Sequence, residues 1–107
     1  MASTPKRLHG PAQVSNAAAT KYTVPAVTKT VIRHVRISNP SGAAVTFTMS
    51  VGADAAAVRV FDGFSIPANS VYDWWTYLVV EAAEIIQALA GTTLVLTLTI
   101  DGDERTL

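Results

Sequence analysis

The sequence predicts an all-β fold: a single antiparallel β-sandwich, jelly-roll or immunoglobulin-like, of about seven or eight strands, with an extended N-terminal arm. From residue 21 onward, apolar and polar residues alternate with a period of two, which is typical of strands that bury one face. Turn-forming residues recur about every 8–12 positions, the spacing expected of sandwiches and barrels. Half of the residues are hydrophobic but only 7% are aromatic, so we expect a thin core of small aliphatic side chains.

The clearest strand is predicted over residues 45–51, where every second residue is apolar and would face inward. A final strand repeats the pattern, with Leu94, Leu96, Leu98 and Ile100 predicted to face inward. Shorter runs predict further strands. These strands lie at residues 31–39, 58–61 and 70–78, and predicted turns separate the runs at residues 39–42, 62–63, 67–69, 91 and 101–102.

Residues 1–20 contain two prolines and a glycine and show no periodic apolar pattern. They are predicted to form an extended or flexible arm, and residues 21–107 the sandwich domain. Four residues of the arm, Lys6, Arg7, Leu8 and His9, are predicted to dock onto a neighbouring protein.

The segment 81–90 allows two interpretations. Its Ala, Glu and Leu content favours a helix of about two turns. As a strand, it would place Ile86 and Ala88 on one face and Ile85 and Leu89 on the other. A helix this short is marginal without packing, so tertiary contacts decide between the two.

Composition excludes several functions. The chain has no cysteine, so it has no disulfide, thiolate metal site or cysteine nucleophile. No apolar run approaches the length needed to cross a bilayer, and no signal peptide is recognisable, so we expect a soluble protein without a membrane partner. Catalytic motifs are also missing, and we expect no enzyme activity, no cofactor and no metal site.

Charge is balanced overall but divided along the chain. Six basic residues and no acid lie in residues 1–36, whereas all eight acids and two basic residues lie in residues 37–107. The formal charge is therefore +6 in the first part and −6 in the second. Either the two parts fold against each other, or opposite patches meet between subunits. A nucleic-acid partner is not expected, because Tyr22 is the only aromatic residue in the basic part.

Arg33, His34 and Arg36 form a basic cluster in a predicted strand. Strict alternation places Arg33 on one face and His34 with Arg36 on the other. The pair could bind an anion, but no sequence neighbour orients the histidine. The favoured interpretation is a polar strand face that meets solvent or another subunit.

Adjacent Trp74 and Trp75 must point to opposite faces of a strand, so one of them needs a cover outside the core. We expect a subunit interface there, flanked by Tyr72 and Tyr77. Burial on both sides and an aromatic platform for a glycan are the alternatives.

Four short stretches form a recognisable set: Tyr22-Thr-Val-Pro25, Arg36-Ile-Ser-Asn39, Ile66-Pro-Ala68 and Gly102-Asp-Glu104. These motifs resemble those of small β-sandwich structural proteins in the virions of tailed bacteriophages, such as minor tail, collar or head-decoration proteins. The resemblance covers residues 20–104. The chain departs from these proteins at Ala82-Ala-Glu84, where they usually have a Gly-Asp turn. It implies a non-enzymatic virion component that assembles with other virion proteins as a homo-oligomer, with a trimer favoured. A carbohydrate-binding or host-surface-binding module that uses an exposed tryptophan is the alternative.

Overall fold

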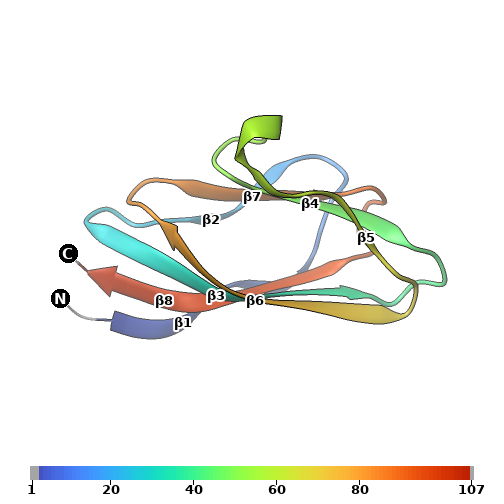
Figure 1. The fold of residues 1–107 in the computed structure, drawn as a ribbon, viewed down its shortest axis with the longest axis horizontal. Coiled ribbons are helices and arrows are strands. Elements are labelled where there is room, and N and C mark those ends of the chain that lie inside the picture. Colours follow the sequence, from blue (N-terminus) through green and yellow to red (C-terminus); the bar gives the residue numbers. More distant parts are fainter. Residues whose placement is uncertain (1–2, 107) are drawn as a thin grey trace.

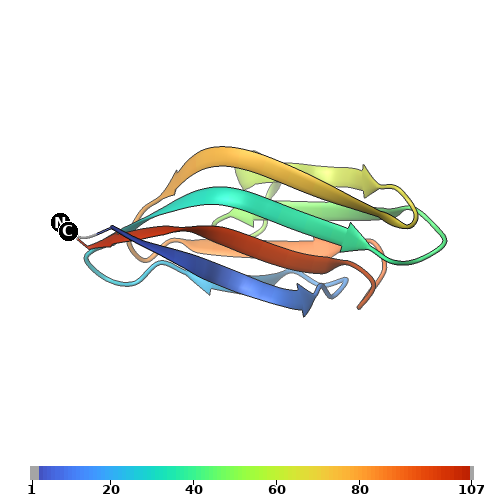
Figure 2. The ribbon, with the colours of Figure 1, turned by 90° about the horizontal axis from the view of Figure 1, so that it is seen from below.

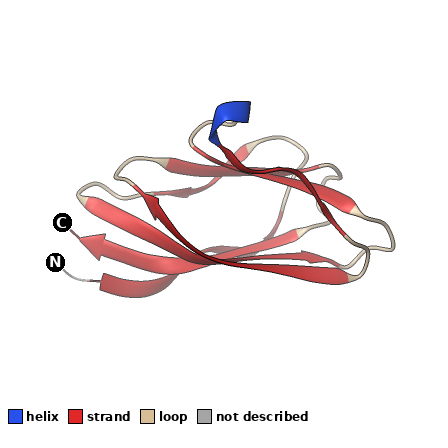
Figure 3. Ribbon diagram, in the orientation of Figure 1, coloured by secondary structure: helices blue, strands red, loops and turns tan. Residues whose placement is uncertain are grey.

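The computed structural model describes residues 3–106, which form eight β-strands and one short 3₁₀ helix (Figure 1). The strands are β1 (Ser3–Gln13), β2 (Ala19–Thr23), β3 (Thr28–Asn39), β4 (Val45–Val51), β5 (Arg59–Ile66), β6 (Ser70–Val80), β7 (Ile85–Ala90) and β8 (Thr97–Thr106). The 3₁₀ helix, Ala56–Val58, lies in the connection between β4 and β5 (Figure 3). In residues 3–106 no helix combines the length and the apolar character required to span a membrane.

The strands form two four-stranded antiparallel sheets, ordered β1-β8-β3-β6 and β2-β7-β4-β5, which face each other (Figure 1). Strand pairing follows a simple rule: β1 pairs with β8, β2 with β7, β3 with β6 and β4 with β5. The chain therefore runs like one long hairpin, turning between β4 and β5 and wound around the core. This is the topology of a jelly roll, and it confirms the predicted β-sandwich while deciding between its two forms.

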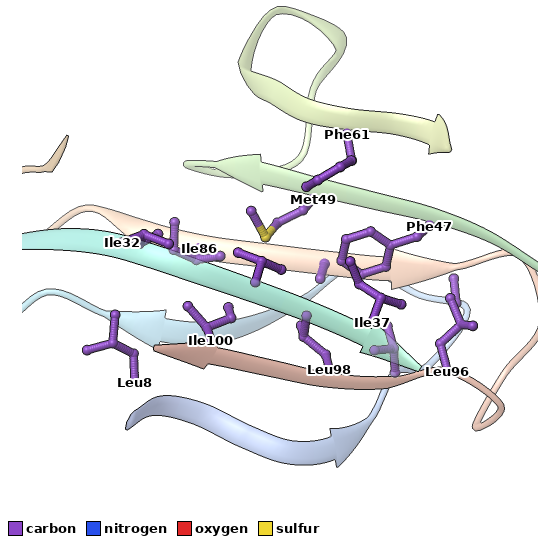
Figure 4. Close-up of a cluster of buried hydrophobic side chains, with 14 of the residues drawn as sticks. Leu8, Ile32, Ile37, Phe47, Met49, Phe61, Ile86, Leu96, Leu98 and Ile100 are labelled. Carbon is purple, nitrogen blue, oxygen red and sulfur yellow. The ribbon is translucent and has the colours of Figure 1, made fainter. Parts of the chain in front are cut away.

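The core is a layer of aliphatic side chains with few aromatic ones, as the composition predicts. It includes Phe47 and Met49 from one sheet and Ile32, Ile37 and Leu98 from the other, all fully buried (Figure 4). Leu94 differs from the prediction. It lies in the turn before β8 with a positive φ of 57° and is 57% exposed, because β8 begins only at Thr97.

The expected N-terminal arm is instead an edge strand. Ser3–Gln13 pair with β8 along nearly the whole strand, and Leu8 is buried in the core. The sequence pattern did not indicate this strand, because it contains prolines and a glycine. An edge strand tolerates these residues. Docking through a free arm of Lys6, Arg7, Leu8 and His9 therefore loses its basis, although residues 1 and 2 lie outside the described part of the chain.

Segment 85–90 is strand β7, with Ile86, Ala88 and Ala90 facing the core. Its pairing on both sides, with β2 and β4, outweighs the local helix propensity. The preceding turn holds Ala83 at φ 67°, a conformation that favours glycine. Two predicted turns are also absent, because residues 62–63 lie within β5 and residues 101–102 within β8.

The motifs behind the family resemblance have structural roles. The Tyr22 hydroxyl contacts both the Glu104 carboxylate and the Thr30 hydroxyl, so the opening and closing motifs meet across the two sheets. Asn39 is buried, and its Nδ2 lies 2.9–3.2 Å from three carbonyl oxygens, those of Ala43, Ile66 and Pro67. These contacts tie the end of β3 to two turns.

Candidate interface on the outer face of the β1-β8-β3-β6 sheet

Figure 2 shows the β1-β8-β3-β6 sheet from below. The side of this sheet that faces away from the core, called the outer face below, carries the basic residues that the sequence singled out. The register of β3 against both of its neighbours shifts between Ile32 and His34, so strict alternation breaks at this bulge. Ile32 and Val35 both face the core, whereas Arg33 and His34 both lie on the outer face. The prediction that alternation divides the cluster between two faces is therefore wrong.

His34 is held from three sides. Its Nε2 lies 2.8 Å from the Asp73 carboxylate and its Nδ1 lies 3.5 Å from the Asp101 carboxylate. Its ring stacks on Trp75, with centroids 3.9 Å apart and planes inclined by 14°. These contacts leave the residue only 7% exposed. Neither carboxylate is a sequence neighbour, which is why the orienting groups could not be predicted.

Both arginines of the cluster are paired on the outer face. Arg36 Nε donates to Asp73 at 2.7 Å, and Arg33 Nη2 lies 2.9 Å from Asp103. The hydrogen bond from Arg36, and after it the one from His34, keeps the pKa of Asp73 below its usual value. The same contact with Asp73 raises the pKa of Arg36. Both arginines of the basic cluster are therefore paired with carboxylates on this face.

The basic first part of the chain and the acidic remainder form ion pairs with each other. Lys6, Lys29, Arg33 and Arg36, all from the basic part, form ion pairs with Glu104, Glu81, Asp103 and Asp73, all from the acidic part. Exposed pairs of this kind contribute little stability each, about 0–1 kcal/mol. They do fix which charged side chains stand next to one another, those of Arg33 and Arg36 on the outer face and that of Lys6 beside the contact of Tyr22 with Glu104.

The four aromatic residues of β6 divide between the two sides of the sheet. Trp75 and Tyr77 point outward and are 73% and 59% exposed, and the Arg33 guanidinium lies 5.1 Å from the centre of the Tyr77 ring. Tyr72 and Trp74 point inward and pack against the aromatic rings of β5. The outer face thus brings together Trp75, Tyr77 and the basic cluster, but not Tyr72 and Trp74.

Two shallow hollows lie on the outer face. The one beside His34 has a volume of about 250 Å³, and its lining is Arg7, Pro11, His34, Arg36, Thr99 and Asp101. The other is open and lies beside Arg33, between the ends of β1 and β8. No group of three His, Cys, Asp or Glu side chains within residues 3–106 could hold a metal ion. The geometry is that of a contact surface with polar recesses.

Comparison with known proteins agrees with the fold. A chain in the structure of infectious bursal disease virus, Gx strain, is similar over 98% of the present chain, with a TM-score of 0.51 and 9% sequence identity. The present chain spans 32% of the length of that viral chain. At this identity the likeness concerns the fold alone. No protein-family model matches the sequence, and no curated protein matches it.

Proposed function

We propose that the protein is a non-enzymatic structural component of a virion. It assembles as a homo-oligomer with other virion proteins on the tail, collar or capsid surface of a tailed bacteriophage. The outer face carries this proposal: Trp75 and Tyr77 stand exposed on a rigid sheet, held in place by His34 and Arg33. Large aromatic side chains with fixed orientation are the usual anchors of protein interfaces.

Two further observations support the proposal. The chain is similar in fold to part of a chain in the structure of a virus, and its turn motifs resemble those of small phage virion proteins. A small domain also gains from assembly, because subunit contacts bury apolar area that a thin core does not supply. The trimer favoured by the sequence remains part of the proposal, and the mass of the assembly tests it.

The direct test is location. Mass spectrometry of density-purified particles from the source virus should detect the chain in a fixed ratio to the major particle protein, and antibody labelling should show it on the particle surface. Light scattering on the isolated protein should give a mass above that of one 11.3 kDa chain. Absence from intact particles would refute the virion role.

Carbohydrate binding is the second candidate, and the exposed plane of Trp75 favours it. An indole that stacks on His34 on one side can offer its other side to a sugar ring, with Asp73 and Arg36 nearby for hydroxyl groups. A glycan array would show binding that Trp75→Ala abolishes and Trp74→Phe, on the inner side, retains. An array without binding would leave assembly as the function of the face.

A further inference from the structure

The two sheets have four edge strands, β1, β6, β2 and β5, and three of them carry features that discourage pairing with another chain. β1 contains Pro5 and Pro11 and has two register shifts against β8. β5 contains Asp62-Gly63 and also has two register shifts. β2 is only five residues long and contains Lys21.

Strand β6 has one register shift, against β3, but its length and composition differ from those of the other three edges. It is 11 residues long and contains no proline, glycine or lysine. Its outward side chains are apolar apart from one carboxylate: Val71, Asp73, Trp75, Tyr77 and Val79, of which the four apolar ones are 42–73% exposed. A long edge strand of this composition is a template for pairing with a further strand.

We propose that β6 pairs antiparallel with β6 of a second copy of this chain, centred on Trp75, so that two four-stranded sheets become one eight-stranded sheet. This inference builds on the proposed function and names the surface and partner of its assembly. Antiparallel pairing about a two-fold axis places the outer faces of both copies on the same side. Trp75 then meets Trp75 of the second copy, Val71 meets Val79, and Asp73 meets Tyr77.

The charges of β6 select this register over its neighbours. Centring the pair on Asp73 would put two carboxylates opposite each other, and centring it on Tyr77 would put Asp73 opposite Glu81, both of which destabilise a sheet. Centring it on residue 74 or 76 would set Asp73 against Trp75 or Val79. With Trp75 at the centre, Asp73 meets Tyr77, whose ring lies under a guanidinium.

That guanidinium belongs to Arg33, which lies over the Tyr77 ring with its side chain 47% exposed. The Asp73 carboxylate is 32% exposed and can accept a hydrogen bond from across the contact. Each copy therefore offers one acceptor and one basic group, and the two-fold axis matches them twice. The contact is self-complementary in charge as well as in apolar surface.

The area involved predicts a weak dimer in isolation. Covering the exposed parts of Trp75 and Tyr77 would bury about 300 Å² per copy, judged from the 150–250 Å² that a buried aromatic side chain contributes. With the two valines and the strand edge, the total stays near the lower end of specific interfaces, about 1,200 Å². A dimer that forms at micromolar concentration fits this size, and a trimer would need a second, different contact.

Cysteine pairs test the register directly, because the chain has no cysteine of its own. Val71→Cys and Val79→Cys chains are mixed and oxidised in air with a copper catalyst. Residues 71 and 79 face each other in the proposed pair, at the Cα separation that a disulfide accepts. Two copies of either variant alone would hold their cysteines about 26 Å apart, eight residues along a strand. We expect at least ten-fold more disulfide dimer in the mixture than in either variant alone.

Sedimentation of single variants supplies the second measurement. Trp75→Lys should raise the dissociation constant at least ten-fold, whereas Leu94→Lys, a control at an exposed leucine distant from β6, should leave it unchanged. Equal cross-linking in the mixture and in the single variants would overturn the inference. An oligomer that Trp75→Lys leaves intact would overturn it too, while the virion role would stand or fall on the particle analysis alone.

Discussion

The contact of Tyr22 with Glu104 offers the most direct test of what holds the two sheets together. Tyr22→Phe removes one hydroxyl and retains the ring. That hydroxyl hydrogen-bonds the Glu104 carboxylate, whose side chain is 17% exposed, and the Thr30 hydroxyl, which is fully buried. A hydrogen bond to a charged group contributes about 1.5–3 kcal/mol, and Lys6 still pairs with Glu104 in the variant. We therefore expect a loss of about 2 kcal/mol in the free energy of unfolding.

For a domain of this size, such a loss lowers the melting temperature by about 8 °C. Urea denaturation at a protein concentration well below the dissociation constant of the dimer measures the change without contributions from subunit association. At that dilution, where the proposed β6 contact does not form, Tyr77→Phe is the matched control, because Tyr77 is 59% exposed on the outer face and its change should cost less than about 0.5 kcal/mol. Equal losses for the two variants would refute the account.

The effect of Tyr22→Phe should also depend on pH in a defined way. The Tyr22 hydrogen bond, ahead of Lys6, lowers the pKa of Glu104 from its ordinary 4.5, so its contribution is present above that pH and declines as the pH falls through the lowered value. Burial, with help from Glu104, raises the pKa of Tyr22 from 10.0 to about 12, so the tyrosine's contribution is complete below pH 10 and declines above it. The difference between wild type and variant should hold constant from about pH 5 to 10 and shrink outside that range. A difference that persists undiminished at pH 3 would contradict this mechanism.

Three further changes test the backbone. Ala83→Gly should raise the free energy of unfolding by about 1 kcal/mol, because Ala83 has a φ of 67° that glycine adopts without strain. The control Ala82→Gly should not raise it, and calorimetry of the two variants measures the difference. Gly102→Ala should abolish folding or cost more than about 3 kcal/mol, since a Cβ there would lie 2.1 Å from a backbone oxygen, while Gly42→Ala, with open space around it, should be neutral by urea titration. Deleting residues 2–13 should unfold the chain, because β8 loses its partner β1 and the core loses Leu8, and circular dichroism measures the loss of strand signal. An unchanged spectrum would support the interpretation of this segment as a dispensable arm.

A strand could be predicted where its own residues alternate between apolar and polar. Residues 45–51 alternate cleanly because one face packs on the core, and the structure shows that pattern. Edge strand β1 could not be recognised, since it needs only one buried anchor, Leu8, and tolerates proline where no ladder hydrogen bond is required. Segment 85–90 stayed ambiguous because its strand state depends on partners distant in the sequence.

Five of the seven residues predicted for an interface share the outer face, whereas Tyr72 and Trp74 point inward. Arg33, His34 and Arg36 were identified from residue type, yet one bulge decides that they share a face. No residue-level pattern marks that bulge, because it arises from the register of β3 against both neighbours at once. Asp73 and Asp101 were missed as partners of His34 for the same reason, since only strand pairing brings them beside it.

Different residues maintain the fold and form the outer face, which explains why a resemblance in motifs says more about fold than about function. Tyr22, Asn39, Gly102 and Glu104 belong to the stretches that carry the resemblance, and each has a structural role. Tyr22 and Glu104 join the two sheets, Asn39 ties the end of β3 to neighbouring turns, and Gly102 lets β8 approach β3 closely. Trp75 belongs to none of those stretches and has no such role, because it lies on the side of β6 that faces away from the core. Substitution there can change what the protein contacts without changing how it folds. Variants of the outer face that keep the melting temperature are therefore the ones that report on function.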